Sequence, residues 1–177
     1  TCAAWLGLSF LDERPWRPLA ALFLSLVLSA ALLTRLDSAI PAAVLATAVL
    51  FAAIRRKNLK RDAASLLMLF LPMILIVGGW LIWKMGYYGG VIPNTFYAKV
   101  SSSTSYTRGL FYLYAFLVVY LLAPFVFIAF SHAAGMMKKY RLGMTAVLAI
   151  LVLWLLYVIR VGGDFMEFRF LVPVLPL

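Results

Sequence analysis

The chain has 177 residues, of which 66% are hydrophobic and 12% are charged. Soluble domains are about 45–50% apolar and about 25% charged, so this composition excludes a soluble enzyme, a disordered tail and a secreted disulfide scaffold. The formal net charge is +10, and Cys2 is the only cysteine, which excludes an internal disulfide and a metal site built from cysteines. The sequence therefore predicts an integral membrane protein, with aromatic residues available for both membrane interfaces.

Both ends of the chain are apolar but short. Residues 2–11 and 170–177 each fall well below the roughly 20 helical residues that a bilayer core of about 30 Å requires. No basic stretch precedes the first run, which argues against a signal peptide. We expect a partial helix at each end. We also expect residues 1–177 to be a single transmembrane region, an internal fragment of a longer membrane protein that is inactive when isolated.

Five apolar runs between these ends are expected to be complete membrane spans: 18–34, 38–54, 63–83, 110–131 and 144–160. The first two would measure about 55 Å as one continuous helix, nearly twice the hydrocarbon thickness. Arg35 and Asp37 interrupt them, and Pro41 suits the first turn of a new helix, so a hairpin is expected. The predicted fold is all-α, a polytopic transmembrane helix bundle.

The basic residues predict the orientation of these spans. Ten of the sixteen Lys and Arg residues fall in the loops 12–17, 55–62 and 132–143. Cytoplasmic loops of membrane proteins collect Lys and Arg, so these three loops are expected in the cytoplasm. The turn 35–37 and the stretches 84–109 and 161–169 then share the outer face. Because this topology accounts for the charge, membrane lipid is an expected partner and nucleic acid is not.

The first long outer stretch, 86–100, reads GYYGGVIPNTFYAKV. Its glycines and the Pro-Asn pair favour defined turns. Any one of its aromatic rings would also suit the interfacial belt. The dense mixture of rings with amide, hydroxyl and ammonium groups fits a sugar, which has apolar faces and a polar edge. Tyr87, Tyr88, Asn94 and Lys99 are therefore candidate binding residues.

The second outer stretch reads RVGGDFMEFRF from residue 160. Arg160 and the Gly-Gly pair would also suit a plain helix end, where the dipole favours a cation. Charged groups at a membrane are costly and usually mark a pathway or a site. Asp164 and Glu167 would bind a cation, hold an acceptor hydroxyl, or pair with Arg160 and Arg169.

By contrast, the single histidine, His132, has no catalytic partner nearby in the sequence, and no soluble-type catalytic motif is present.

At these residues the chain resembles a known family. The stretches YYGGVIPNTFYAK and RVGGDFMEFRFLVPVLP are similar to paired signatures of bacterial multi-spanning glycosyltransferases of the GT-C type. The closest similarity is to the terminal arabinofuranosyltransferases of the mycobacterial cell wall and their uncharacterised relatives. The segment TRLDS at 34–38 is similar to the Thr-Arg-Pro-Asp-Gly of that group, with Leu36 and Ser38 in place of Pro and Gly.

The resemblance implies an inverting glycosyltransferase of the bacterial inner (cytoplasmic) membrane. Its donor would be a polyprenyl-phosphate sugar, its acceptor a glycan or glycolipid of the cell envelope, and its active face extracytoplasmic. Enzymes of this type carry the main catalytic aspartate in the first outer loop, near the N-terminus of the full protein. No residue of this chain is therefore assigned as the catalytic base, and Asp164 is an auxiliary candidate.

In this mechanism a carboxylate takes the acceptor proton while cations stabilise the leaving phosphate. The candidate phosphate-binding residues are Lys99, Arg160, Arg169 and, more weakly, Arg35. The candidate sugar- or acceptor-binding residues are Tyr87, Tyr88, Asn94, Asp164 and Glu167. Asp164 would also help to hold a divalent cation, Mg²⁺ or Mn²⁺, although no set of metal ligands is assigned.

Two other classes of protein are open. A secondary transporter or lipid flippase predicts ionisable groups or broken helices at mid-membrane, in paired repeats. The sequence shows no internal repeat, and its charges collect at the outer surface instead. A non-catalytic membrane assembly subunit is the third class, and it gives no reason for dense polar outer stretches beside apolar spans.

Overall fold

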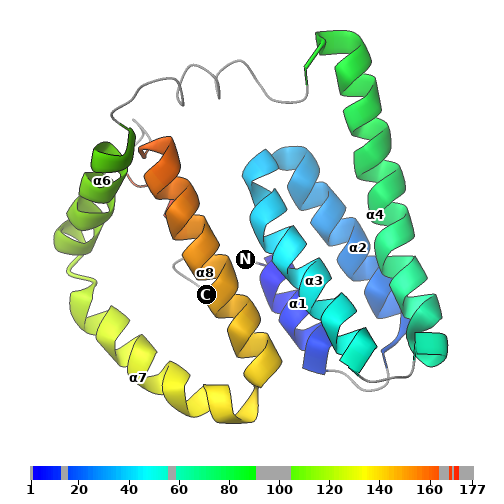
Figure 1. Cartoon of the computed structure of the whole chain (residues 1–177), viewed down its shortest axis with the longest axis horizontal. Coiled ribbons are helices and arrows are strands. Elements are labelled where there is room, and N and C mark those ends of the chain that lie inside the picture. Colours follow the sequence, from blue (N-terminus) through cyan, green and yellow to red (C-terminus); the bar gives the residue numbers. More distant parts are fainter. Residues whose placement is uncertain are drawn as a thin grey trace. The chain divides into compact units, whose positions relative to one another are not determined.

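The computed structural model describes residues 2–12, 16–55, 59–90, 105–163, 168, 170 and 171. Within these residues every regular element is a helix, which confirms the predicted all-α fold. The helices are α1 (Cys2–Asp12), α2 (Pro18–Thr34), the short 3-10 helix η1 (Leu36–Ser38), α3 (Ala39–Arg55), α4 (Leu59–Tyr88), α6 (Ser105–Val119), α7 (Ala123–Lys139) and α8 (Arg141–Val161) (Figure 1). The chain divides into two compact units, Thr1–Val91 and Ile92–Leu177, called unit 1 and unit 2 below.

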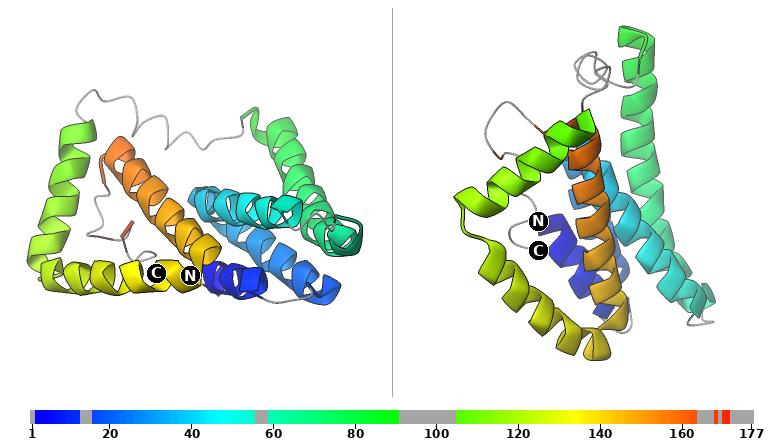
Figure 2. Two further views of the ribbon diagram at one scale, coloured as in Figure 1. Left: turned by 60° about the horizontal axis from the view of Figure 1, so that its bottom comes forward. Right: turned by 60° about the vertical axis from the view of Figure 1, so that its left-hand side comes forward.

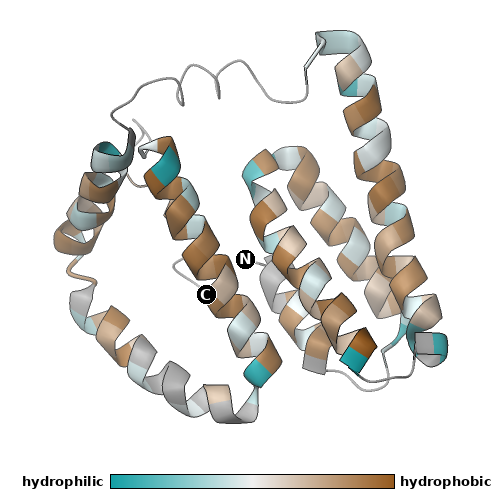
Figure 3. Ribbon diagram, in the orientation of Figure 1, coloured by the Kyte–Doolittle hydropathy of each residue, from teal (hydrophilic) through white to brown (hydrophobic). Residues whose placement is uncertain are grey.

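Three described helical segments are long and apolar enough to cross a membrane: Leu36–Arg55, Asp62–Tyr88 and Arg141–Val161. Two shorter apolar helices accompany them, Pro18–Thr34 and Tyr106–Val119. Apolar residues cover most of the length of these helices, and hydrophilic residues gather toward their ends (Figure 3). The molecule is therefore a helical membrane protein.

In unit 1 a stripe of small side chains brings α2 against its neighbours. Pro18 occupies the first turn of α2, where its missing N–H is not needed. The buried residues of α2 recur three and four positions apart: Ala21, Leu24, Ser25, Leu28 and Ser29. Small residues at this spacing let helix backbones approach closely, which is the main source of helix association in a membrane. With this face α2 packs along α4, and α1 packs against α2 and α3.

The hairpin of α2 and α3 forms as predicted, with both legs within one residue of the expected ends. The buried face of α3 follows the same helical period as that of α2, and it consists of Ala42, Leu45, Ala48, Val49, Ala52 and Ala53. Gly7 of α1 lies so close to Leu45 that a Cβ on the glycine would stand 2.8 Å from a methyl carbon of that leucine. The predicted partial helix at the N-terminus is thus present and packed.

Helix α4 is longer than the span predicted at 63–83. Its 30 residues measure about 45 Å, more than the hydrocarbon thickness. It ends at Gly89, whose φ of +67° is left-handed and whose N–H donates to the carbonyl of Met85. Residues 84–88 are therefore helical, whereas the sequence analysis placed them in an outer loop.

In unit 2 the predicted span at 110–131 is wrong, because two helices occupy it. Helix α6 ends at Val119 and α7 begins at Ala123, and the two meet at an angle (Figure 2). Leu121 has a φ of +49°, its N–H donates to the carbonyl of Val118, and the N–H of Leu122 donates to that of Leu117. These paired bonds around a left-handed residue are a Schellman motif, which ends a helix. Pro124 also disfavours a continuous helix, since it has no N–H for the preceding turn.

The break lies within the depth that α8 spans. Helix α8 has 21 residues, begins three residues before the run predicted at 144–160 and ends one residue after it, and is about 31 Å long. Gly109 of α6 lies against the backbone of Ile159 near the end of α8. From this contact α6 diverges from α8, and its far end lies beside neither end of α8 (Figures 1 and 2). Helix α7, about 25 Å long, leads from there back to the start of α8.

Candidate functional site

Four of the predicted site residues fall within the described chain: Arg35, Tyr87, Tyr88 and Arg160. The other five lie outside the described residues: Asn94, Lys99, Asp164, Glu167 and Arg169. The geometry of the candidate site is consequently given by the ends of the helices that carry or flank these positions, first in unit 1 and then in unit 2.

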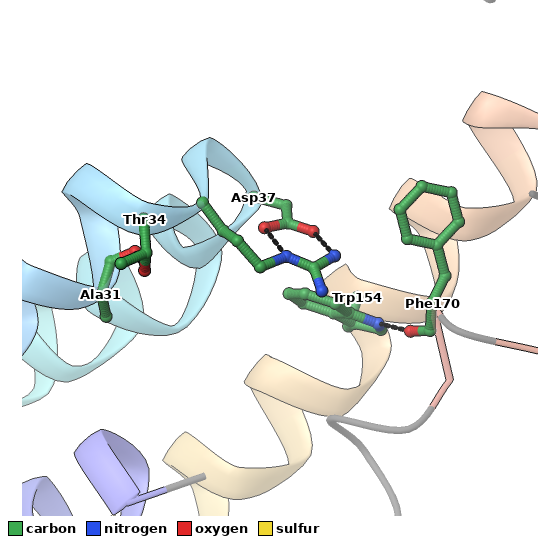
Figure 4. A network of polar contacts seen from close by, with 6 residues as sticks. Ala31, Thr34, Asp37, Trp154 and Phe170 are labelled. Carbon is green, nitrogen blue, oxygen red and sulfur yellow. Dashed lines mark hydrogen bonds and ion pairs between the residues drawn. The ribbon is translucent and has the colours of Figure 1, made fainter.

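In unit 1, Arg35 is held by Asp37 at the turn between α2 and α3. Its Nε donates to Oδ1 of Asp37 at 3.1 Å, and its second guanidinium nitrogen donates to Oδ2 at 2.5 Å (Figure 4). The Asp37 side chain is 7% exposed and that of Arg35 is 41% exposed. This bidentate pair neutralises much of the positive charge that would attract a phosphate. Arg35 is thus first a structural partner of Asp37, and the sequence analysis left Asp37 out of the site.

Tyr87 and Tyr88 lie on the last turn of α4, in an exposed aromatic cluster. The ring of Trp83 stacks on that of Tyr87 with 5.5 Å between centroids, and the rings of the two tyrosines are 4.7 Å apart. One turn before, the ammonium of Lys84 lies 4.8 Å from the ring centroid of Trp80. The cluster combines open ring faces with a cation, which suits a membrane interface or a sugar.

The turn between α2 and α3 and the last turns of α4 lie at the same end of unit 1 (Figure 1). Helix α2 starts level with Ser65 in the second turn of α4, because Ser65 Oγ donates to the carbonyl of Trp16, just before α2. Both helices rise 1.5 Å per residue, so Arg35 is level with about residue 84 of α4. The topology thus confirms that 35–37 and the end of α4 share one face, as the orientation argument predicted.

In unit 2, Arg160 lies on the last turn of α8, directly over an aromatic ring. Its guanidinium carbon is 5.1 Å from the centroid of the Tyr106 ring on α6, and both side chains are exposed. Stacking of this kind fixes a guanidinium while leaving its N–H groups available. The cation also lies at the negative end of the α8 dipole, where it is stabilised.

Gly162 and Gly163 end α8, as the capping interpretation predicted. Their φ values are +84° and +83°, and both N–H groups donate to the carbonyl of Val158. A Cβ on Gly163 would stand 2.7 Å from the ring of Tyr112, so this position has no room for a side chain. The glycines therefore serve the turn itself, and they direct the chain toward α6.

The chain after this turn packs on both helices of unit 2. The ring of Phe168 lies 5.2 Å from the rings of Tyr112 and Phe116 and 5.6 Å from that of Tyr120, all on one face of α6. On α8, the indole Nε1 of Trp154 donates to the carbonyl of Phe170 at 2.7 Å (Figure 4). Sequence reasoning missed this aromatic cluster, although the spacing of the three α6 rings by four residues was visible.

No group of three or more His, Cys, Asp or Glu side chains able to hold a metal ion occurs among the residues that the structure describes. The two acids named for a divalent cation, Asp164 and Glu167, lie outside that part of the chain. The described geometry therefore assigns no metal ligands.

The fold and its polar helix ends define an all-helical, multi-spanning membrane protein. Comparison of the chain with protein-family models, with curated proteins and with solved structures finds no match.

Proposed function

We propose that the chain is part of a GT-C type glycosyltransferase of the bacterial inner membrane, which transfers sugar from a polyprenyl-phosphate donor to a cell-envelope acceptor on the extracytoplasmic side. The stretches around Tyr87 and Asp164, with their resemblance to that family, motivate the proposal. The observation that carries it is the position of Arg160. This arginine is a stacked, exposed cation at the membrane boundary, beside the double-glycine turn that leads into the charged stretch.

A phosphate joined to membrane lipid lies at that level of a bilayer. Arginine binds phosphate in a bidentate manner through its planar set of N–H donors. When the bond to the sugar breaks, the leaving phosphate gains negative charge, which a fixed cation stabilises more in the transition state than in the ground state. In the proposed function Arg160 makes this contact. Lys99, Arg169 and, more weakly because Asp37 already holds it, Arg35 are the other candidates for phosphate contact.

The remaining polar residues would hold the sugar and the acceptor. Tyr87 and Tyr88 present exposed rings at the end of α4, which suit the apolar faces of a sugar. Asn94, Asp164 and Glu167 would hold its hydroxyl groups, and Asp164 would be the auxiliary carboxylate. The catalytic base itself is proposed to lie outside residues 1–177.

The test is transfer of sugar from a polyprenyl-phosphate donor by the full-length protein in membranes. We expect Arg160→Ala to lower kcat/KM by about 30- to 100-fold, as for loss of one transition-state contact, and Arg160→Lys to lower it less. Asp164→Ala and Arg169→Ala test the adjoining stretch in the same assay. Transfer at near parental rates in all of these variants would remove this end of unit 2 from the site.

Arg55 provides the matched control. It too stacks on a ring, with 4.9 Å from its guanidinium carbon to the centroid of Phe51, but it lies at the opposite, basic end of unit 1. Arg55→Ala should leave transfer within about twofold of the parent, since this arginine contacts no substrate in the proposed site. An equal loss in both variants would mean that the effect of Arg160→Ala is not specific to the proposed site.

One observation favours the transporter as a second candidate. The break between α6 and α7 is a discontinuity at membrane depth, as found at the binding sites of many secondary transporters. Such transporters carry the discontinuity in paired repeats, however. Each of the described helices α2, α3 and α4 of unit 1 is continuous, so no counterpart of the break occurs there. A flux assay in proteoliposomes containing the full-length protein distinguishes the two candidates.

A further inference from the structure

The residues described after α8 do not continue away from its end. Phe168, Phe170 and Leu171 pack beside α6 and α8, and the latter two are 7% and 2% exposed. The distribution of Lys and Arg predicted an outer loop for the whole stretch 161–169. The contacts of these packed residues show how far below the end of α8 they lie.

Helix α8 gives a measure of depth. Trp154 lies seven residues before Val161, hence about 10 Å below the end of the helix. Its indole N–H reaches the carbonyl of Phe170, which must therefore lie near the same level. Since α8 is about as long as the hydrocarbon is thick, this level is about one third of the way into the bilayer core.

Helix α6 shows what covers Phe168. Gly109 of α6 contacts Ile159 close to the end of α8, and from there α6 diverges from α8 (Figures 1 and 2). The ring of Phe168 contacts those of Tyr112 and Phe116 on α6 and that of Tyr120 just after it. Phe168 therefore packs on the side of α6 past the point where α6 meets α8.

Non-helical backbone at this depth needs partners inside the protein. Each unsatisfied carbonyl or N–H in hydrocarbon costs several kcal/mol, and such segments occur only where protein covers them. The hydrogen bond from the indole N–H of Trp154 to the carbonyl of Phe170 satisfies two polar groups that would otherwise both be unpaired in lipid. The aromatic rings of α6 cover the segment from the other side.

We propose that the turn that carries Phe168, Phe170 and Leu171 re-enters the membrane beside α6 and α8, and that Trp154 is the positioning residue that holds this segment in place. The consequence for activity rests on the proposed function. In that function the re-entrant segment positions the charged stretch next to it in the sequence for a lipid-linked substrate, so Trp154 acts on the reaction through the segment and not by contact with substrate.

The depth is tested by thiol labelling of the full-length protein in membranes, in a background in which Cys2 and any cysteine outside residues 1–177 are replaced by serine. Leu171→Cys reports on the segment, Thr107→Cys is the exposed control at the start of α6, and Leu153→Cys is the lipid-depth control beside Trp154. With a water-soluble maleimide added from outside, we expect Leu171→Cys to react about a hundredfold more slowly than Thr107→Cys, because a thiol in apolar surroundings forms little thiolate. Equal rates at the two positions would overturn the re-entrant segment.

The role of Trp154 is tested by Trp154→Phe, which keeps an aromatic ring and removes the donor. Loss of the bond should raise the fraction of open segment, and with it the labelling rate at position 171, by about tenfold. Labelling at position 153 should not change, and Trp83→Phe, on the exposed face of α4, should leave position 171 protected. Unchanged labelling in Trp154→Phe would overturn the assignment of the indole N–H.

Transfer kinetics separate this inference from the proposed function. If the proposed function holds, Trp154→Phe should lower kcat with little change in KM, because a displaced segment affects the reacting geometry more than capture of the lipid. If the parent protein shows no transfer, the proposed function is wrong, while the labelling rates still decide whether the segment re-enters the membrane.

Discussion

The two units hold their helices together in different ways. In unit 1, α2 packs mainly along α4, and the buried faces of α2 and α3 consist of Ala, Ser, Leu and Val. In unit 2, α8 packs on both α6 and α7, with a close backbone approach at Gly109 and with aromatic rings from three chain segments around it. Packing in unit 1 thus relies on small and aliphatic side chains, whereas unit 2 adds one tight glycine contact and a set of aromatic rings.

Their backbones differ in the same sense. Among the described residues of unit 1, a left-handed φ occurs only at Gly89, after the end of α4. The described part of unit 2 has three such residues, at Leu121, Gly162 and Gly163, and each lies where a helix ends and the chain turns. Regular helices satisfy their own backbone N–H and C=O groups in a membrane, whereas a turn at membrane depth must find other partners for them. Within the described residues, such irregular backbone is concentrated in unit 2.

The strongest test of this comparison is a methyl group at Gly109. A Cβ there would stand 2.4 Å from the carbonyl oxygen and 2.6 Å from the Cα of Ile159, and backbone atoms cannot turn away. Gly109→Ala should therefore push α6 off α8 and lower the free energy of unfolding by about 2–3 kcal/mol. Reversible unfolding in mixed micelles measures the loss.

Gly79 of α4 is the matched control in unit 1. Nothing lies within 4 Å of a Cβ built there, so alanine meets open space inside a helix. Gly79→Ala should be neutral or stabilise the protein by about 0.5–1 kcal/mol, through its better helix propensity. Equal effects of the two substitutions would mean that the close crossing at Gly109 does not hold unit 2 together.

The next effect concerns the polar turn of unit 1. Arg35→Ala would leave the largely buried carboxylate of Asp37 without its bidentate partner. Because the arginine is partly exposed, the cost should be about 1–2 kcal/mol, below that of a fully buried pair. A double-mutant cycle with Asp37→Ala measures the coupling: the double variant should be less destabilised than the two single losses added together. Strict additivity would show that the pair contributes no interaction energy.

The sequence predicts the membrane-spanning helices well and the positions of their ends less well. The spans of α2 and α3 were predicted to within one residue and that of α8 to within three, because an apolar run bounded by charges determines a membrane helix without reference to its neighbours. The end of α4 was placed too early, since Trp83, Tyr87 and Tyr88 suit an interface whether helical or not. Local composition therefore predicts spans better than it predicts their ends.

The candidate site was less predictable than the spans. Stacking of Arg160 on Tyr106 joins residues that are 54 positions apart, and the bond from Trp154 to Phe170 depends on a chain reversal at two left-handed glycines. Neither contact has a local sequence signature, because the first requires the packing of α6 on α8 and the second requires the chain to fold back on α8. The ion pair between Arg35 and Asp37 was easier to predict from the sequence, since oppositely charged residues two positions apart in a tight turn commonly form an ion pair.

The sequence also contained the residue that breaks the predicted span at 110–131. Pro124 lies in its middle, but transmembrane helices tolerate proline when neighbouring groups satisfy the freed carbonyl, so proline alone does not predict a break. What ends α6 is the left-handed conformation of Leu121, which a leucine rarely adopts. A glycine at 121 would have been recognised as a helix end.

Leu121→Gly therefore gives the smallest effect and the one whose sign is most informative. The leucine side chain is 74% exposed within the unit, so little packing is lost when it is removed. Its left-handed φ should cost about 1 kcal/mol, and glycine should recover most of this as a gain in the free energy of unfolding. In a continuous helix the same substitution would destabilise by about 1 kcal/mol instead. Leu122→Gly, at a position without positive φ, should destabilise in either case, so opposite signs at the two neighbours would establish the break between α6 and α7.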